Sequence, residues 1–477
     1  MLNWVELSST FGRRTVLLIA LGLFAIGAII CGLSHGFISL IVGRSIQGVG
    51  GGGLIALTQV LITDMAPLRM RGKFFALIST VWALGSVTGP IAGGALAGDA
   101  AWRWMFWLQL PFVGLGLVGA VAFLKLHYRE RSRITKLQEL DYIGSTIFVG
   151  SVTSFLIGVS WGGVQHAWSD WHVLVPLILG VTGLLIFCLY ELKAPTGAIL
   201  PLELFSNAST SIVYISTMLH GIILWTMVYY LPVYFQGVKG YSPLISGVAA
   251  LPQTCTVVPC AMAVGICAGV TKRYRWALWL GWLLTTLGCG LLILLDVSTG
   301  IAAWIFLELV SGVGIGLLFP SMSLAIQASS AQQHTAVAAT LFAFFRAFGQ
   351  AVGVAVGGVL FQNRFETELE SFTDLSRVSQ QSSLDAVSLV QVIREMPPDA
   401  LQTVHLKIVF SRSCHAIWAV MCGLAGISLI ANLFVREYDL DQAHETDQGF
   451  VYELERKDEK TGKQYTEEPK ILQVNST

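Results

Sequence analysis

The sequence predicts an all-α, polytopic membrane protein with two pseudo-symmetric helical bundles, two linker helices and about twelve transmembrane helices in total. Three observations support this fold class. The 477 residues are 54% hydrophobic and only 12% charged, whereas a soluble domain carries about 25% charged residues. Twelve apolar runs are long enough to cross a bilayer, and one glycine pattern occurs twice. The net charge of zero and the lack of a basic stretch exclude a soluble nucleic-acid-binding protein.

The apolar runs define the predicted helices, because about 18 to 20 apolar residues span the hydrocarbon core of a bilayer. Long apolar runs also form the cores of soluble proteins, but twelve runs with short connections favour a lipid environment. The predicted spans are residues 15–33, 37–62, 73–97, 104–124, 142–161, 172–192, 209–235, 245–270, 276–295, 301–326, 338–361 and 413–435.

The charges of the short loops predict the orientation of these spans. Fourteen lysines and arginines fall in the loops on one side, and only Arg103 and Lys239 fall in those on the other. Because cytoplasmic loops carry the excess of basic residues, the first side is expected to be cytoplasmic. Trp168 and Trp171 fall at predicted outer helix ends, where an aromatic belt is expected.

The spans divide the chain into four predicted regions. Residues 1–124 form an incomplete N-terminal bundle, and residues 125–208 form a linker with two extra transmembrane helices. Residues 209–435 form the C-terminal bundle, with a long outer loop at 362–410. Residues 436–477 are polar and mixed in charge, so they predict a disordered cytoplasmic tail.

An internal repeat relates the two bundles at an offset of 264 residues. GRSIQGVGGGGL at 43–54 matches LELVSGVGIGLL at 307–318, and GSVTGPIAGGAL at 85–96 matches GQAVGVAVGGVL at 349–360. The offset spans an even number of helices, so both copies have the same orientation, as in a two-bundle transporter that binds its substrate between the bundles. Glycines spaced by four residues allow close helix approach, so ordinary packing is the alternative explanation of the pattern.

Three ionisable residues lie inside predicted spans, where a charge costs about 2.5–3.5 kcal/mol. Arg44, Glu308 and Arg346 are therefore candidates for proton coupling. Arg44 and Glu308 occupy equivalent positions of the repeat, and Gln47 lies one turn from Arg44, so it could line the same cavity. The alternatives are a structural hydrogen bond for Arg44, a permanent ion pair for Glu308 and snorkelling to the interface for Arg346.

Aromatic residues of the predicted C-terminal bundle could line an apolar substrate path. The candidates are Trp225, Tyr229, Tyr230, Phe319 and Phe342. His220 lies among them and is interpreted as a satisfied core histidine. No metal-ligand cluster and no nucleophile–base spacing stands out, so no metal, cofactor or enzymatic activity is expected.

Several of these motifs resemble those of the major facilitator superfamily, specifically its fourteen-helix drug:proton antiporter branch, as found in fungal efflux pumps. GRSIQGVGGG, which carries Arg44, Gln47 and Gly48, resembles the proton-coupling motif of that family. WRWMFWLQLP resembles the family's WRWxFxxNxP, with Gln109 in place of the asparagine. GSVTGPIAGG resembles the antiporter motif gxxxGPxxGG. Its defined residues are Gly85, Gly89, Pro90, Gly93 and Gly94.

The resemblance implies a monomeric transporter of the plasma membrane that exports small amphipathic organic molecules, such as drugs, toxins or secondary metabolites, in exchange for protons. A vacuolar or other internal membrane is the alternative location. Two other functions remain open. The chain could import or facilitate the passage of siderophore-like or other small solutes, or it could be an inactive, truncated or non-transporting membrane protein.

The N-terminal residues depart from the family pattern. The family's loop motif reads roughly GxLxDxxGRR, and the gate loop of this chain retains its Gly12, Arg13 and Arg14 but has Ser9 at the aspartate that helps to gate the cytoplasmic side. The resemblance also implies that the first helix and most of the second are missing. The spans at 209–235 and 245–270 have no repeat partners downstream of residue 1, so an N-terminal truncation is expected.

Overall fold

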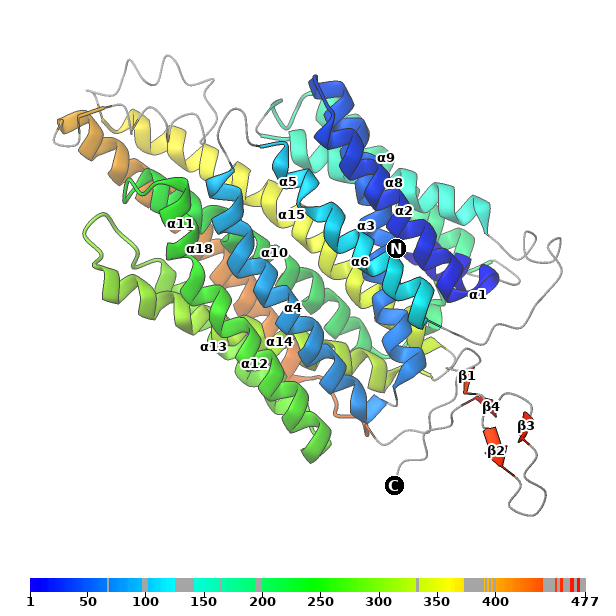
Figure 1. Cartoon of the computed structure of the whole chain (residues 1–477). Coiled ribbons are helices and arrows are strands. Elements are labelled where there is room, and N and C mark those ends of the chain that lie inside the picture. Colours follow the sequence, from blue (N-terminus) through cyan, green and yellow to red (C-terminus); the bar gives the residue numbers. More distant parts are fainter. Residues whose placement is uncertain are drawn as a thin grey trace.

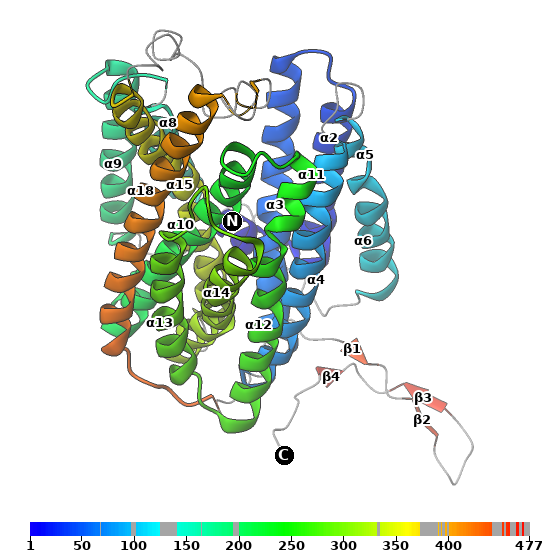
Figure 2. The same cartoon turned by 90° about the vertical axis from the view of Figure 1, so that its left-hand side faces the viewer.

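Figure 1 and Figure 2 show a computed structural model of the chain as a bundle of long helices in two views. The structure describes residues 1–66, 68–96, 102–124, 141–163, 165–193, 200–331, 334–372 and 400–440. It also describes residues 390, 393, 396–397, 451–452, 455–457, 464–466 and 470–471. The side chains of some helical residues, mostly in α4, lie outside this description.

The helices follow the predicted spans along the chain. The N-terminal half contains α1 (Leu2–Phe11), α2 (Arg13–Gly32), α3 (Phe37–Met65), α4 (Leu68–Ala95), α5 (Trp104–Trp107) and α6 (Gln109–Phe123). The linker contains α8 (Tyr142–Trp161) and α9 (Trp171–Glu191). The C-terminal half contains η1 (Leu202–Phe205), α10 (Ala208–Gly237), α11 (Pro243–Ala249), α12 (Leu251–Thr271), α13 (Arg275–Leu292), α14 (Ile301–Ser329), α15 (Thr335–Glu370) and α18 (Leu401–Leu433).

The predicted fold class is confirmed. Ten segments of the described residues are long and apolar enough to cross a membrane, and α4 and α13 occupy the two other predicted positions. The chain is therefore a multi-pass membrane protein. Among the α-helices of the described residues, only α1 lies outside the predicted spans. Its apolar side chains, among them Trp4 and Leu7, pack against Val16 of α2 and Leu57 of α3, and this burial holds a polar N-terminal segment in a helix.

The repeat is visible in the helix boundaries. Phe37 begins α3 and Ile301 begins α14, Met65 ends α3 and Ser329 ends α14, and both pairs of residues are 264 positions apart. The α2–α3 and α13–α14 contacts are also equivalent. A Cβ atom on Gly50 would lie 2.7 Å from the Ala20 carbonyl oxygen, and one on Gly314 would lie 2.8 Å from the carbonyl carbon of Leu284, the equivalent of Ala20.

The turns that precede α2 and α13 share a backbone feature. Gly12 has φ 89° between α1 and α2, and Lys272 has φ 60° between α12 and α13. Lys272 is the only non-glycine residue of the described chain with positive φ. Glycine at position 12 is required because this conformation is unfavourable for residues with a Cβ atom.

The C-terminal half has the larger core. Its main hydrophobic cluster joins α10, α13, α14, α15 and α18 and includes fully buried Trp282 and Trp418. In the N-terminal half the clusters are small, such as Val16, Ala20 and Leu57. Figures 1 and 2 show α4 beside α11 and α12, so a helix of the N-terminal half lies along the C-terminal half.

The linker, the predicted outer loop and the predicted tail each contain regular structure among the described residues. The linker helix α8 packs on α15 through ring contacts of Phe148 with Phe344 and of Phe155 with Phe348. The helices α15 and α18 continue into the predicted outer loop, where Glu368 joins Arg412 at 2.9 Å. In the predicted tail, β1 (Val451–Tyr452) pairs with β4 (Lys470–Ile471), and β2 (Glu455–Lys457) pairs with β3 (Gln464–Thr466). Most of the tail lies outside the described residues, so its disorder stays a prediction.

Candidate functional site

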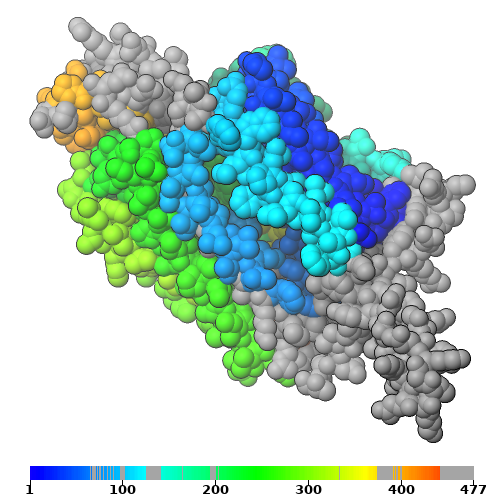
Figure 3. All heavy atoms as spheres, in the orientation of Figure 1, coloured from blue at the N-terminus to red at the C-terminus, as the bar shows by residue number. Residues whose placement is uncertain are grey.

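A cavity of about 520 Å³ lies between α4 and the helices α10, α12, α14 and α15. The N-terminal half contributes Val81, Trp82 and Gly85 to its wall. The C-terminal half contributes mainly apolar side chains from its four helices. Figure 3 shows that the surface is hollowed between α4 and α6, where deeper atoms of the C-terminal half are visible. A substrate cavity between the two halves is the arrangement expected of the sequence repeat.

Some of the predicted substrate-path residues line this cavity and others do not. Trp225 and Phe319 lie in its wall. Tyr229 is not part of the wall and is 49% exposed, with its ring centroid 5.9 Å from that of Trp225. Tyr230 also lies outside, because its ring packs on Phe361. Phe342 is buried behind Phe319, with ring centroids 5.5 Å apart, so it supports the wall from the protein side.

Arg346 brings a cationic group to the apolar wall. Its guanidinium carbon lies 4.4 Å from the ring centroid of Phe319 and 5.2 Å from that of Trp82. Its Nε has no hydrogen-bond partner within the described part of the chain. Because α15 begins at Thr335, Arg346 lies about three turns inside the helix and not at its end. Its side chain is held by aromatic faces in the cavity.

His220 lines the same cavity from α10. Its Nε2 lies 3.3 Å from the carbonyl oxygen of Ile315, and its ring meets Trp282 edge-on at 6.5 Å. An Nε2–H donated to that carbonyl leaves Nδ1 as an acceptor, which has no partner among the described residues. Only one of the two ring nitrogens of His220 therefore has a hydrogen-bond partner among the described residues. The position of His220 in the cavity wall was not predicted from the sequence.

Glu308 is fully buried on α14, one layer behind the cavity. Its carboxyl group lies against the backbone of Gln253, in the first turn of α12, where backbone N–H groups lack partners within the helix. No ion pair to Glu308 occurs among the described residues, and the permanent pairing weighed above is therefore not seen there. Gln253 also lines the cavity, and its side chain donates to Met227 Sδ at 3.0 Å, so this residue contacts both Glu308 and the cavity.

Arg44 is exposed and lies outside the cavity wall. Its guanidinium covers the ring of Phe106 at 4.6 Å and donates to Gln47 Oε1 at 3.3 Å. Gln47 Nε2 in turn donates to Gln109 Oε1 at 2.6 Å. Arg44 and Gln47 thus share one polar chain between α3 and α6, but neither is part of the cavity wall described above, which the sequence had suggested they could line. A Cβ atom on Gly48 would meet no heavy atom within 4 Å in the described part of the chain.

The gate loop is held by a buried ion pair. Arg13 Nε lies 3.0 Å from Asp64 Oδ2 at the end of α3, and Arg13 Nη1 donates to Ser8 Oγ. Arg14 Nη2 donates to the Val121 carbonyl oxygen at 2.7 Å. Ser9, at the motif's aspartate position, donates its hydroxyl to the Glu6 carbonyl oxygen at 2.8 Å and does not take part in this ion pair. Sequence reasoning missed Asp64 because it lies 51 residues from Arg13.

A second buried arginine joins the two halves at the predicted cytoplasmic end. Arg71 Nη1 donates to Gln327 Oε1 of α14 at 2.8 Å, across 256 residues of sequence. Arg71 also donates to the carbonyl oxygens of Ala66 at 2.9 Å and Thr63 at 3.0 Å. Gln327 is fixed by a bond from its Nε2 to Ser323 Oγ at 3.0 Å. In the sequence, Arg71 was counted only among the basic residues of the short loops. Its partner Gln327 could not be recognised, because it lies 256 residues away.

Within the described part of α4, Gly85 of the antiporter motif at 85–94 lines the cavity wall. A Cβ atom on Gly89 or Gly93 would meet no heavy atom within 4 Å among the described residues. A Cβ atom on Gly94 would lie 3.0 Å from the backbone nitrogen of Leu244, so α4 approaches α11 closely there. The side chain of Pro90 lies outside the described residues.

Comparisons with known proteins agree with this architecture. The family model described as Major Facilitator Superfamily matches residues 1–354. The chain is 46% identical over 451 residues to MFS transporter L2 of Phoma sp., covering 94% of this chain and 75% of that protein. It is 34% identical over 458 residues to efflux pump FUS6 of Gibberella fujikuroi, covering 94% of this chain and 82% of that protein.

Solved structures show the same fold at low sequence identity. A bacterial homolog of the human lysosomal transporter Spinster, in an inward-facing and occupied conformation, has a TM-score of 0.55 at 14% identity, covering 90% of this chain and 84% of that one. The human organic anion transporter MFSD10 has a TM-score of 0.54 at 13% identity, covering 90% and 81%. The resemblance found in the sequence motifs is confirmed, and the chain belongs to the Major Facilitator Superfamily.

Proposed function

We propose that this transporter exports small amphipathic organic molecules across the plasma membrane in exchange for protons, working as a monomer. The observation that carries the proposal is the apolar cavity of about 520 Å³ between the two halves. Its volume is in the range of about 300–1,000 Å³ that holds drug-sized ligands. Relatives such as FUS6 bear the name efflux pump, which supports export as the direction of transport.

The cavity wall favours a particular class of substrate. Trp82, Trp225 and Phe319 present aromatic faces, and the Arg346 guanidinium lies among them, its Nε without a hydrogen-bond partner among the residues that the structure describes. Aromatic faces bind flat apolar groups, and a guanidinium binds carboxylate or phenolate oxygens through charged hydrogen bonds. We therefore propose planar molecules with an acidic or strongly electronegative group as preferred substrates.

Glu308 is the proposed proton site. A buried carboxylate without a cation is unfavourable in the membrane, whereas a protonated carboxyl group is neutral and much less costly to bury. Gln253 contacts both Glu308 and the cavity, so movement of one side chain would connect the acid with water or substrate. Gain or loss of the proton would then change the relative stability of the inward- and outward-facing states.

Arg44 stays a proposed coupling residue through the motif resemblance. Its polar chain to Gln47 and Gln109 links α3 to α6, so we propose that it couples helix movement to protonation without touching the substrate. The Arg71–Gln327 bond is proposed to close the cytoplasmic end of the cavity in this conformation. Alternating access then requires that bond to break.

Reconstituted protein can test export and coupling together. Fluorescent amphipathic organic anions, with organic cations as a comparison set, would be added outside vesicles of both orientations, and their uptake would be assayed with and without a pH gradient. We expect gradient-driven accumulation of anions only in inverted vesicles. Accumulation in the opposite orientation would establish import, and failure of substrate exchange in both orientations would mark a non-transporting protein.

The variant Glu308→Gln separates proton coupling from substrate binding. We expect this isosteric, uncharged side chain to abolish gradient-driven accumulation while leaving energy-independent exchange intact. Glu366→Gln, an exposed acid at the end of α15, is the matched control. Full gradient-driven transport by Glu308→Gln would remove Glu308 as the proton site without contradicting export itself.

A further inference from the structure

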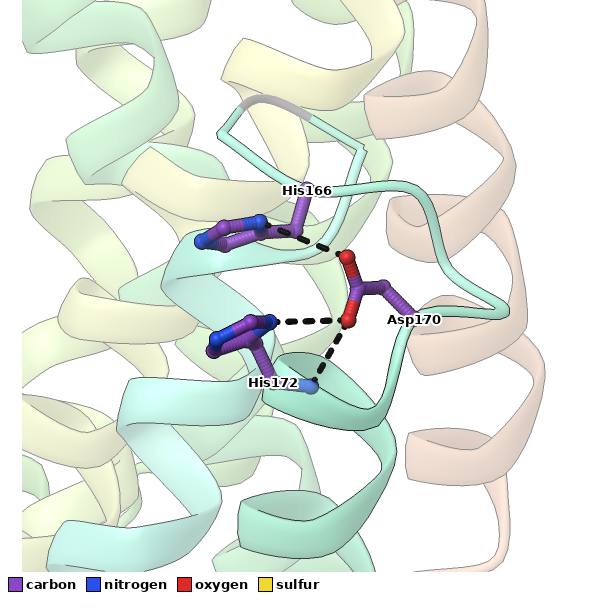
Figure 4. Close-up of side chains that lie close together, drawn as sticks. All are labelled: His166, Asp170 and His172. Carbon is purple, nitrogen blue, oxygen red and sulfur yellow. Dashed lines mark hydrogen bonds and ion pairs between the residues drawn. The ribbon is translucent and has the colours of Figure 1, made fainter.

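Three side chains with metal-ligating atoms meet at the tip of the α8–α9 hairpin (Figure 4). His166 precedes the turn into α9, Asp170 is the N-cap of α9, and His172 lies in its first turn. His166 Nδ1 lies 3.5 Å from Asp170 Oδ2, and His172 Nδ1 lies 2.9 Å from Asp170 Oδ1. These residues lie outside the cavity wall and play no part in the proposed transport mechanism.

The arrangement brings together two imidazoles and one carboxylate. One ligand atom from each residue lies within 4.8 Å of the other two. Figure 4 shows the two rings face to face on the same side of Asp170, and their centroids are 4.5 Å apart with an interplanar angle of 10°. Imidazole nitrogen and carboxylate oxygen are the donor set that suits zinc and other divalent first-row transition metals.

The backbone holds these residues in place without any ion. The His166 N–H donates to the Trp161 carbonyl oxygen at 3.1 Å, and the Gly163 N–H donates to the His166 carbonyl oxygen at 2.8 Å. Gly163 has φ 72°, which permits this tight turn. The site is thus already folded, so a metal ion would lose little binding energy to ordering of the loop.

Asp170 contacts both imidazoles and is held in place by His172. Its Oδ1 accepts the His172 backbone N–H at 3.0 Å and lies 2.9 Å from His172 Nδ1. The three side chains are each about one-third exposed, so an ion and its water ligands can reach them. An N-cap alone would explain Asp170 and His172, but it does not require the second imidazole of His166.

We propose that His166, Asp170 and His172 bind one divalent transition metal ion of the zinc class on the outer side of the membrane, with water completing the coordination. The ion would connect the end of the loop to the start of α9. The same loop touches α15, since a Cβ atom on Gly163 would lie 3.2 Å from Val359 Cγ1. Metal binding would therefore stabilise the linker hairpin where it packs on the C-terminal half.

Calorimetric titration of Zn²⁺ tests the proposal on full-length, metal-stripped protein purified in detergent through a tag without histidines. We expect one ion per chain. Changes to groups around a metal typically cost roughly 10- to 100-fold in affinity, so His166→Asn, His172→Asn and Asp170→Asn should each weaken binding at least tenfold. His35→Asn is the matched control, because His35 is an exposed histidine on the loop between α2 and α3.

Equal Zn²⁺ affinity in the wild type and the His166→Asn/His172→Asn double variant would overturn the proposal. The wild type alone gives a second, independent readout, so a variant that fails to fold does not end the test. Bound Cu²⁺ should show electron paramagnetic resonance couplings to two imidazole nitrogens. A spectrum of Cu²⁺ without nitrogen couplings would also overturn the site.

Discussion

The helices α4 and α15 carry the same glycine pattern 264 residues apart, yet the two stripes have different surroundings. On α15, a Cβ atom on Gly353 would lie 2.5 Å from the Ile222 carbonyl oxygen of α10, and one on Gly349 would lie even closer to the Met218 carbonyl oxygen. On α4, a Cβ atom on Gly89 or Gly93 would meet no heavy atom within 4 Å in the described part of the chain, and one on Gly94 would lie 3.0 Å from the backbone nitrogen of Leu244 in α11.

The comparison shows that glycine spacing gives a helix the capacity for close approach, while the neighbouring helix decides whether that capacity is used. The α10–α15 pair is joined by backbone-to-backbone contact. By contrast, α4 meets α12 through side chains such as Thr80 and Met262, whose Oγ1 and Sδ are 3.5 Å apart. We infer that α15 is fixed to α10 and that α4 is the helix free to move beside the cavity.

The largest expected effect is a loss of folding when a bulky residue replaces a glycine of α15 that packs on the α10 backbone. Gly353→Leu would force a side chain into the backbone of Ile222, and overpacking typically costs about 1–3 kcal/mol or more. Gly89→Leu places the same side chain in open space. We expect loss of monodisperse protein for the first variant and a normal yield for the second.

Thermal unfolding of purified protein in detergent checks this difference. If Gly89→Leu unfolded as readily as Gly353→Leu, the two stripes would be equally packed and the comparison would fail. If Gly89→Leu folded normally but transported poorly, the α4 stripe would act in a different conformation of the cycle.

The next effect concerns substrate binding, because Arg346 of the fixed helix faces Trp82 of the mobile one. A hydrogen bond to a charged group contributes about 1.5–3 kcal/mol, so Arg346→Ala should weaken binding of organic anions roughly 10- to 150-fold. Arg346→Lys keeps the charge but not the planar group, and it should recover binding in part. Unchanged affinity in Arg346→Ala, measured by fluorescence titration, would show that the guanidinium does not contact the substrate.

A similar test applies to Arg44. Arg44→Ala should abolish proton-coupled transport while leaving membrane insertion and anion affinity unchanged, because Arg44 lies outside the cavity wall. The measurement is gradient-driven accumulation compared with binding in the same preparation. Full accumulation would remove Arg44 from the coupling mechanism.

A smaller effect is expected from loss of the Arg71–Gln327 hydrogen bond, which is proposed to close the cytoplasmic end of the cavity. Gln327→Ala removes one of the three acceptors of Arg71, which should destabilise the closed end by about 1.5 kcal/mol, or roughly tenfold in population. Labelling of a cysteine introduced into the cavity wall, with a reagent applied from the cytoplasmic side, should become faster. Gln362→Ala is the control, since Gln362 bonds only to Glu366 on the exposed end of α15 among the described residues. Equal labelling rates in both variants would contradict the closure.

The smallest effect is that of a single methyl group. Alanine is favoured over glycine inside a helix by roughly 0.5–1 kcal/mol, so Gly89→Ala should raise the unfolding temperature slightly. Gly353→Ala should lower it, because its Cβ atom would lie 2.5 Å from a carbonyl oxygen. Shifts of the same sign in calorimetry would indicate that both positions are packed alike.

The fold could be predicted from the sequence because its signals are local. Apolar length located the twelve spans, and the 264-residue offset predicted that α3 and α14 would be equivalent. The site was predicted only in part. Trp225, Phe319 and Arg346 line the cavity, but which face of α10 turns inward depends on its packing against α15, so Tyr229 and Tyr230 could not be distinguished from Trp225.

The long-range polar contacts could not be predicted. Gln327 and Asp64 are ordinary polar residues at helix ends, and only the folded chain brings them to Arg71 and Arg13. Pseudo-symmetry predicted equivalent positions for Arg44 and Glu308 but not equivalent surroundings. Glu308 is fully buried against the first turn of α12, whereas Arg44 is exposed and contacts Phe106 and Gln47.

Distances between spin labels test most directly whether α4 moves relative to the C-terminal half while α15 stays fixed to α10. In a variant without its native cysteines, one label pair would join Thr88 of α4 to Val270 of α12, and a second would join Ile215 of α10 to Ala351 of α15; all four residues are exposed. The account predicts that the first distance changes when pH is lowered or an organic anion is added, while the second stays constant. A constant first distance, or equal changes in both, would contradict it.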